Sequence, residues 1–217
     1  MKFSAAAVIG LGHFGARLCD ELSQAGVEVI GIDKNRVLVE EMRDRIALPV
    51  QMDSRDPLAL KGQDLVAVGT VIVAIGDSFE DSVLTIAHLR ELEVPRIIAR
   101  IINPVHEKIL RTMGITELIQ PEQEGATSLA RRLQFRKVRS CTGLSSDWNL
   151  VEVDVPDALI GKDPATGVFE EQHGLRLVAV QSGEGGEIDL PRPGRSLAAG
   201  DILTLFGPTD RIRHLLR

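Results

Sequence analysis

The sequence has few cysteines, no long apolar run and no excess of positive charge. Cys19 and Cys141 are the only cysteines among 217 residues, which excludes a disulfide framework and a cysteine metal site. No apolar stretch reaches the 18 or so residues that a membrane-spanning helix needs. The N-terminus carries Lys2 but lacks the apolar segment and cleavage site of a signal peptide. We therefore expect a cytoplasmic protein.

The charge balance also bears on possible partners. There are 25 lysines and arginines against 31 aspartates and glutamates, a net charge of −6. Nucleic acids and anionic membrane surfaces are bound through basic surfaces, so neither is expected to be the main partner. No glycine-rich loop ends in Gly-Lys followed by Ser or Thr, which disfavours phosphate cleavage by a P-loop mechanism.

Residues 8–15, Val-Ile-Gly-Leu-Gly-His-Phe-Gly, are the most informative stretch that is present. Gly10 allows a tight turn after an apolar strand, Gly12 lets phosphates approach the backbone, and Gly15 lets the next helix lie close to the strand. The first helical turn leaves amide groups without partners, and its dipole favours a phosphate. Asp33 follows Gly10 by 23 residues, close to the spacing of an acid that accepts hydrogen bonds from ribose. We therefore predict a nucleotide site.

The first 120 residues alternate between apolar strands and amphipathic helices, which predicts a Rossmann-like α/β fold with a doubly wound parallel sheet. The expected strands are 5–9, 28–33, 49–51, 71–75, 96–100 and 116–119. The expected helices are 14–24, 35–45, 57–60, 79–92 and 104–113, the second of them capped by Asp33 or Asn35.

The pattern changes at Pro121, which suggests a second domain of α+β type. We expect a helix at 121–135, a polar and irregular segment at 136–147, strands at 148–154, 175–181 and 201–206, a helical stretch near 164–172, a hairpin turn at 183–186 and a terminal helix at 209–216. The expected domains are therefore 1–120, which binds the nucleotide, a helix and linker at 121–147, and a small C-terminal domain at 148–217.

No group of side chains forms an evident catalytic constellation. His88, His106 and His214 fall on expected helices and are interpreted as surface residues. His173 precedes Gly174 and is interpreted as a helix-end residue. Cys19 falls in the first helix and is interpreted as a small buried hydrophobe. A nucleotide site without chemistry indicates a sensor.

The chain resembles the KtrA/TrkA family of cytosolic regulators of potassium conductance over nearly its full length. The matching blocks are residues 7–15, 29–33, 71–76, 97–100, 119–122, 159–162 and 200–203. The resemblance implies an N-terminal nucleotide domain, a crossover helix and a small C-terminal domain. It also implies dimers that assemble into an octameric ring beneath a membrane-embedded potassium transporter subunit, with ATP and ADP, or NAD and NADH, changing the shape of the ring.

The resemblance also implies roles for individual residues. The phosphate turn would comprise Gly10, Leu11, Gly12, His13, Phe14 and Gly15, with Asp33 at the adenosine ribose, Asp53 near the adenine, Ala74, Ile75 and Gly76 along the base and ribose, and Arg100 toward the phosphates. The adjacent Lys34 and Ser54 are also expected among the nucleotide-binding residues. Glu122 would help to hold a divalent cation, Mg²⁺ or Ca²⁺, between dimer partners. Some relatives bind cyclic di-AMP in the C-terminal domain, which makes the region of Val168, Phe169, His173 and Pro191 a further candidate.

Several alternatives stay open. Asp53 could cap its own turn, Arg100 could pair with a surface acid, and Glu122 could stabilise a helix N-terminus. His13 stands where several ATP-responsive relatives have an arginine, which weakens the case for ATP over ADP. Asp33 disfavours NADP, because its carboxylate would repel a 2′-phosphate, although Lys34 could partly offset this.

Two other functions stay open, and part of the sequence predicts an oligomeric surface. An NAD-dependent oxidoreductase would need a base beside the nicotinamide, and a transcriptional repressor would need a basic or helix-turn-helix surface. Apolar residues in excess of one sheet face predict a dimer interface or additional core: Val83, Ile86, Leu89, Val105, Ile109, Leu110, Met113, Leu129, Leu133 and Phe135.

Overall fold

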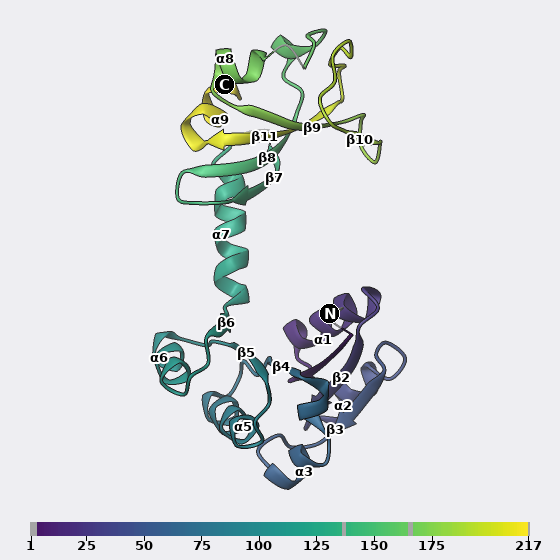
Figure 1. Cartoon of the computed structure of the whole chain (residues 1–217), viewed down its shortest axis with the longest axis vertical. Coiled ribbons are helices and arrows are strands. Elements are labelled where there is room, and N and C mark those ends of the chain that lie inside the picture. Colours follow the sequence, from purple (N-terminus) through teal and green to yellow (C-terminus); the bar gives the residue numbers. More distant parts are fainter. Residues whose placement is uncertain (1–3, 136–137, 165–166, 217) are drawn as a thin grey trace. The chain divides into compact units, whose positions relative to one another are not determined.

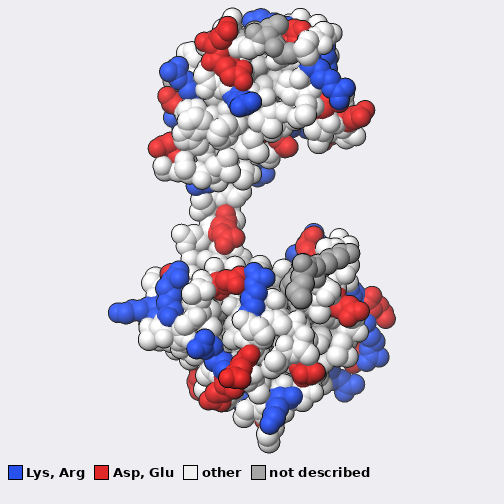
Figure 2. Space-filling model, in the orientation of Figure 1, with Lys and Arg blue, Asp and Glu red and all other residues white. Residues whose placement is uncertain are grey.

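The computed structural model describes residues 4–135, 138–164 and 167–216. The chain divides into two compact units, Met1–Pro121 and Glu122–Arg217 (Figure 1). Within the described residues, every helix is too short or too polar to cross a membrane. Acidic and basic side chains are interspersed over the face of the molecule seen in Figure 2.

The first unit contains a six-stranded parallel sheet in the order β3-β2-β1-β4-β5-β6. The strands are β1 (Ala5–Ile9), β2 (Glu28–Asp33), β3 (Leu48–Gln51), β4 (Thr70–Val73), β5 (Arg96–Arg100) and β6 (Glu117–Ile119). The helices are α1 (His13–Gln24), α2 (Arg36–Glu41), α3 (Pro57–Lys61), α4 (Leu65–Val68), α5 (Phe79–Glu91) and α6 (Pro104–Thr112). This strand order is that of a doubly wound dinucleotide-binding fold, so the predicted fold class is confirmed.

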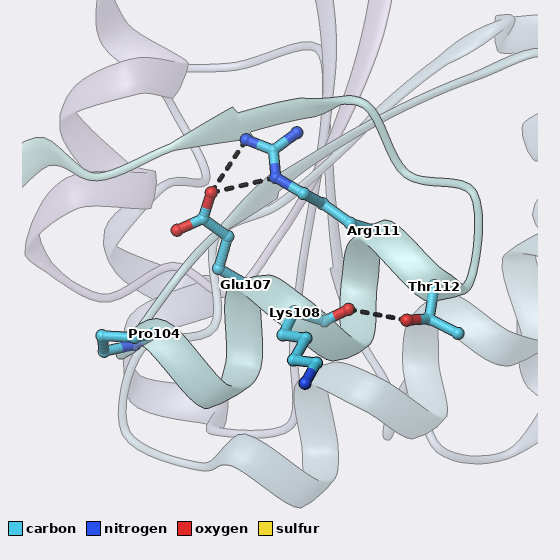
Figure 3. A pocket seen from close by; sticks show the side chains of 5 residues that line it. All are labelled: Pro104, Glu107, Lys108, Arg111 and Thr112. Atoms are coloured by element: carbon cyan, nitrogen blue, oxygen red, sulfur yellow. Dashed lines mark hydrogen bonds and ion pairs between the residues drawn. The ribbon is translucent and has the colours of Figure 1, made fainter.

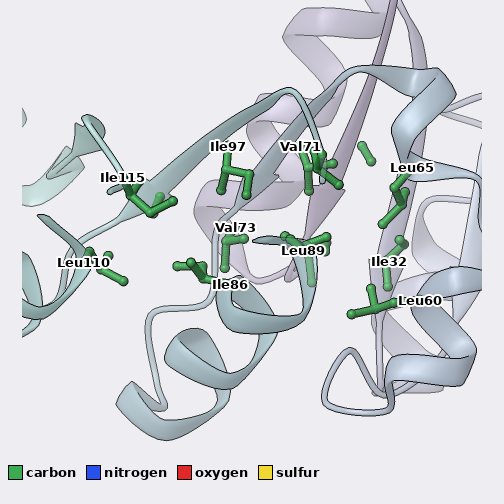
Figure 4. Packing of buried hydrophobic residues seen from close by; sticks show 14 of the residues in the cluster. Ile32, Leu60, Leu65, Val71, Val73, Ile86, Leu89, Ile97, Leu110 and Ile115 are labelled. Carbon is green, nitrogen blue, oxygen red and sulfur yellow. The ribbon is translucent and has the colours of Figure 1, made fainter. Parts of the chain in front are cut away.

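Helices cover both faces of this sheet, as a parallel sheet requires. On one face, side chains from α3 to α6 pack against the strands, among them Leu60, Leu65, Ile86 and Leu110 (Figure 4). The other face packs against α1 and α2. Every residue of β4 is buried, which explains the apolar run from Val71 to Val73.

The second unit begins with α7 (Pro121–Leu133) and contains an antiparallel sheet in the order β10-β9-β11-β8-β7. Its strands are β7 (Val138–Gly143), β8 (Trp148–Asp154), β9 (Arg176–Gln181), β10 (Ile188–Asp189) and β11 (Ile202–Pro208). A short 3-10 helix η1 (Asp157–Leu159) and the helices α8 (Val168–His173) and α9 (Thr209–Leu215) complete it. The two α-helices pack against β8, β9 and β11 through the buried side chains of Phe169 and Ile212.

Part of the expected secondary structure was wrong. The segment expected to be irregular contains β7, whose Cys141 is buried and whose Gly143 pairs with Asn149 of β8. Residues 136 and 137 of that segment lie outside the described residues. The helix expected over 35–45 ends at Glu41, although Asn35 caps it as predicted, accepting a hydrogen bond from the amide of Val37.

The hairpin turn at residues 183–186 is confirmed, because Ser182 and Glu187 are hydrogen-bonded across it and β10 pairs with β9. The apolar residues proposed for a dimer interface divide into three groups, of which Val83, Ile109 and Met113 are partly buried. Ile86, Leu89, Leu110 and Phe135 are buried in the chain's own cores. In contrast, Val105, Leu129 and Leu133 are 65%, 46% and 73% exposed.

Candidate functional site

The turn between β1 and α1 is built from glycines in closely constrained positions. Gly10 has φ of 98°, a left-handed conformation that favours glycine, and a Cβ there would lie 3.0 Å from the amide nitrogen of Ile75. A Cβ on Gly15 would overlap the carbonyl oxygen of Gly10. At Gly12 an added Cβ would meet no described atom within 4 Å, so the N-terminus of α1 is open there. The structure thus brings the strand and helix together and leaves space above Gly12.

The glycine turn lies where ligands bind in other open α/β sheets, at a reversal of the strand order. β1 and β4 are neighbours, yet the chain passes through β2 and β3 between them, so the strand order reverses here. Their carboxyl ends are joined by a 2.7 Å hydrogen bond from the amide of Ala74 to the carbonyl oxygen of Ile9. Ligands of open α/β sheets bind at such a reversal, and the predicted residues Ala74, Ile75 and Gly76 follow β4 at this edge.

Asp33 braces the glycine turn. One carboxylate oxygen accepts a 2.7 Å hydrogen bond from the amide of Leu11, and the other accepts one of 2.7 Å from the amide of Asn35. Each oxygen of an ionised carboxylate has a second lone pair, so ribose hydroxyls can still donate to Asp33. The sequence motif predicted that Asp33 lies near the ribose. The hydrogen bond from Leu11 to Asp33 could not be predicted, because it depends on how the two strands are paired.

Arg100 reaches toward the start of α1 from the end of β5. The carbon of its guanidinium lies 5.9 Å from the centre of the Phe14 ring, in a cation–π arrangement. A Cβ on Gly76 would collide with the same guanidinium, so the glycine makes room for the arginine. A positive charge is therefore held beside the first turn of α1.

Four charged side chains form a second group, which we call the charge cluster at the end of β2: Lys34, Asp53, Arg55 and Asp81. Lys34 and Asp81 form an ion pair of 2.7 Å, and Arg55 pairs with Asp53 at 2.6 Å and with Asp81 at 3.4 Å. Hydrogen bonds from Arg55 lower the pKa of Asp53 to about 2, and Lys34 lowers the pKa of Asp81. Asp81 in turn raises the pKa of Lys34. All four groups are thus charged at neutral pH.

Asp53, predicted near the adenine, and its neighbour Ser54, predicted to bind the nucleotide, also have structural roles. Asp53 accepts a 3.0 Å hydrogen bond from the amide of Arg55, the turn-capping arrangement considered as its alternative. The Ser54 hydroxyl is buried and lies 2.7 Å from the Thr85 hydroxyl of α5. The first contact stabilises the turn within the loop after β3, and the second fixes that loop against α5.

His106 was predicted at the surface, and this was wrong. It is fully buried, and its ring lies 5.1 Å from the Phe79 ring in a T-shaped arrangement. Nδ1 accepts a 3.2 Å hydrogen bond from the amide of Ile102, while Asn103 caps α6 by accepting from the amide of His106. Burial lowers the pKa of His106, so the ring is neutral at pH 7. The Asn103-Pro104 helix start gave a signal for the cap, but none for the burial.

The predicted metal ligand Glu122 is exposed in the first turn of α7. Within the described part of this chain there is no group of three His, Cys, Asp or Glu side chains that could hold a metal ion. A cation at Glu122 would therefore need further ligands, such as water or side chains of another chain.

A shallow hollow on α6 is lined by Pro104, Glu107, Lys108, Arg111 and Thr112 (Figure 3). Glu107 and Arg111 form an ion pair of 2.8 Å there, and the Thr112 hydroxyl donates to the carbonyl oxygen of Lys108. None of the lining residues belongs to the glycine turn, so the hollow is not the predicted nucleotide site.

The fold and the turn together define a Rossmann-like ligand-binding protein, and comparisons with known proteins give its family. The family model of the TrkA-N domain matches residues 6–121. The chain is 34% identical to Ktr system potassium uptake protein C of Bacillus subtilis, covering 95% of this chain and 93% of the relative. Ktr system potassium uptake protein A of the same organism is 30% identical over 96% and 93%. The chain therefore belongs to the TrkA-N domain family, as its sequence resemblance predicted.

Solved structures support the same fold for both units. The structure of the GsuK RCK domain aligns with a TM-score of 0.62 at 19% identity and covers 98% of this chain. This chain spans 47% of that longer chain, about half its length. At this level of identity the likeness establishes the fold alone.

Proposed function

We propose that this chain is a cytosolic regulatory subunit of a membrane potassium uptake system, controlled by an adenine nucleotide. The observation that carries the proposal is similarity over nearly the full length of both chains to proteins named for potassium uptake, in a chain that keeps the glycine turn. We also propose that it is a sensor and not an oxidoreductase.

The nucleotide would occupy the carboxyl edge of the parallel sheet. Its phosphates would lie over Gly12 at the open end of α1, with Arg100 supplying positive charge and Asp33 accepting from the ribose. The loops after β3 and β4 would flank the adenine. Two solved structures with this fold hold such ligands: a GsuK channel bound to NAD, at a TM-score of 0.59, and a Shewanella denitrificans Kef C-terminal domain in its AMP-bound form, at 0.53. The ligand class is accordingly an adenine nucleotide: ATP, ADP, AMP, NAD or NADH.

Regulation would follow from differential binding. A nucleotide that binds one conformation of an oligomer more tightly shifts the population toward it, without any covalent chemistry. We propose dimers that assemble into an octameric ring on the transporter subunit. The exposed apolar residues Val105, Leu129 and Leu133 would contribute to contacts between chains, and Glu122 would bind Mg²⁺ or Ca²⁺ together with a partner. Cyclic di-AMP is a second candidate ligand, bound by the second unit.

A binding panel tests the nucleotide part. Calorimetric titration of the purified chain with ATP, ADP, AMP, NAD and NADH, with and without Mg²⁺ or Ca²⁺, should give saturable binding of at least one of them. Asp33→Ala should weaken that binding, whereas Glu117→Gln, which removes an ion pair with Arg96 between β5 and β6, should not. No binding by any of the five would overturn the nucleotide site.

The transport part needs a separate measurement. Cells without other potassium uptake systems, expressing a Ktr-type membrane subunit, should take up potassium at a different rate when this chain is present. Light scattering should give a dimer or a larger ring. A strictly monomeric chain with no effect on uptake would contradict the proposal.

A further inference from the structure

The ribose end of the proposed site holds a lysine in a position that matters for selectivity. Lys34 follows Asp33 directly, at the end of β2, and its side chain is half-exposed. Dinucleotide sites that accept a 2′-phosphate use a basic side chain near this position, and sites that accept a free 2′-hydroxyl use an acid. This chain has both types next to each other, so the sequence disfavours a 2′-phosphate through Asp33 but leaves open how far Lys34 offsets that effect.

In the structure, the Lys34 side chain is already engaged in an ion pair. The Lys34 ammonium lies 2.7 Å from a carboxylate oxygen of Asp81, which is in the first turn of α5 and only 9% exposed. Asp81 is itself fixed, because its amide donates a 3.1 Å hydrogen bond to the Ser78 side chain that caps the helix. The second basic side chain of the cluster, Arg55, is held by Asp53 and Asp81.

The charge cluster together with Asp33 has a net negative charge, which repels an added phosphate. Lys34 and Arg55 contribute two positive charges, Asp53 and Asp81 contribute two negative charges, and Asp33 adds a third negative charge. A 2′-phosphate carries between one and two negative charges at pH 7. To bind one, Lys34 would have to leave Asp81, and a nearly buried carboxylate would remain without its ammonium partner, which is unfavourable.

We infer that Asp81 is a positioning residue that makes the site selective for adenine nucleotides with a free 2′-hydroxyl, because it holds Lys34 in an ion pair. This inference rests on the proposed nucleotide site and deepens it. Without the Asp81 charge, Lys34 becomes available to a 2′-phosphate, while Arg55 keeps its own pair with Asp53.

The test compares ligands that differ only in the 2′-phosphate. Binding of 5′-AMP is measured against adenosine 2′,5′-bisphosphate, and of NAD⁺ against NADP⁺, by calorimetry with the full chain. The wild-type protein should prefer the free 2′-hydroxyl by at least tenfold. Asp81→Asn, which keeps the shape and removes the charge, should reduce that preference by about tenfold, the effect of one charge-assisted hydrogen bond to phosphate. The double variant Asp81→Asn with Lys34→Ala should restore the preference.

Controls separate this role from a general effect on the fold. Glu117→Gln removes an arginine–carboxylate pair on β6, the opposite edge strand, and should leave the preference unchanged. Should Asp81→Asn fail to fold, Asp81→Ser removes the same charge with a side chain suited to the first turn of a helix. An unchanged preference in the Asp81 variant, or no reversal by Lys34→Ala, overturns the inference alone. Failure of the wild-type protein to bind any of the four ligands overturns the inference, and failure to bind ATP, ADP and NADH as well overturns the proposed site with it.

Discussion

Replacing Gly15 with alanine tests the close approach of α1 to the backbone of Gly10 in the glycine turn. A Cβ at this position would overlap the carbonyl oxygen of Gly10, lie 3.0 Å from its carbonyl carbon and lie 3.3 Å from the Cβ of Ala74. The first two atoms belong to the backbone, so no change of side-chain rotamer relieves the overlap. Helix α1 would have to move away from β1, which would also displace the amides at its N-terminus.

Two opposing effects set the size of the change. Alanine is favoured over glycine within a helix by about 1 kcal/mol. Overpacking costs about 1–3 kcal/mol, and a backbone overlap belongs at the upper end of that range. We therefore expect Gly15→Ala to lower the stability of the first unit by about 2 kcal/mol. For a unit of this size that corresponds to a midpoint roughly 8 °C lower.

Thermal unfolding followed by circular dichroism measures this shift, and two glycine variants serve as controls. Gly125 lies inside α7, where an added Cβ meets no described atom within 4 Å, so Gly125→Ala should be neutral or stabilising by up to about 1 kcal/mol. Gly12→Ala should cost at most about 1 kcal/mol, because its φ of −62° suits any residue although glycine is favoured over alanine at a helix N-cap, yet it should weaken nucleotide binding by filling the space for a phosphate.

The result that refutes this reasoning is specific. If Gly15→Ala unfolds at the wild-type temperature and binds nucleotide as tightly, the close approach of α1 to β1 contributes nothing to the site. The single tryptophan, Trp148, lies in β8 of the second unit, so its fluorescence reports that unit separately. A loss confined to the tryptophan signal would also contradict the prediction.

Three further predictions concern single side chains. Asp33→Asn should weaken adenine-nucleotide binding at least tenfold in calorimetry, because one of its two backbone hydrogen bonds is lost with the charge; unchanged affinity would remove Asp33 from the site. Burial lowers the pKa of His106 below the ordinary value near 6.5, so the unfolded chain binds more protons and stability should fall as the pH drops below about 6.5. His106→Gln should flatten that part of the pH profile in denaturant titrations, and an identical slope would disprove the assignment. Burial raises the pKa of Cys19 to about 12 and also raises that of Cys141, so neither thiol should react with a disulfide reagent at pH 8 until the protein unfolds; rapid labelling of the folded chain would show the burial to be wrong.

Much of the first unit was predictable, because its signals are local. A strand, a glycine turn, a helix and an acid at the end of the next strand occupy one continuous stretch, and the structure builds them in that order. Buried parallel strands such as β4 and β5 are marked by three successive apolar residues at their centres or ends. The bracing of the turn by Asp33 follows from the same stretch once the two strands are paired.

The elements that were missed depend on distant partners. β7 has a mixed sequence, Val-Arg-Ser-Cys-Thr-Gly, and forms a strand because its residues pair with β8 from Val138↔Val153 to Gly143↔Asn149. Helix α4 spans four residues between Asp64, with φ of 47°, and Gly69, with φ of 80°, too short for a periodic signal. His106 lies on a polar helix, and only the packing of α5 against α6 places Phe79 over its ring.

The pair formed by Lys34 and Asp81 has the same origin and the largest consequence for function. The two residues are 47 positions apart and meet because α5 begins beside the ends of β2 and β3. The sequence motif that consists of Gly10, Gly12, Gly15 and Asp33 does not include position 81, so it does not distinguish chains that have Asp81 from chains that lack it. If Asp81 acts as inferred, two chains with the same glycine fingerprint will differ in their tolerance of a 2′-phosphate according to the residue at this one position on α5. Ligand selectivity in this fold would then depend on the charge that faces the end of β2, in addition to the motif that identifies the site.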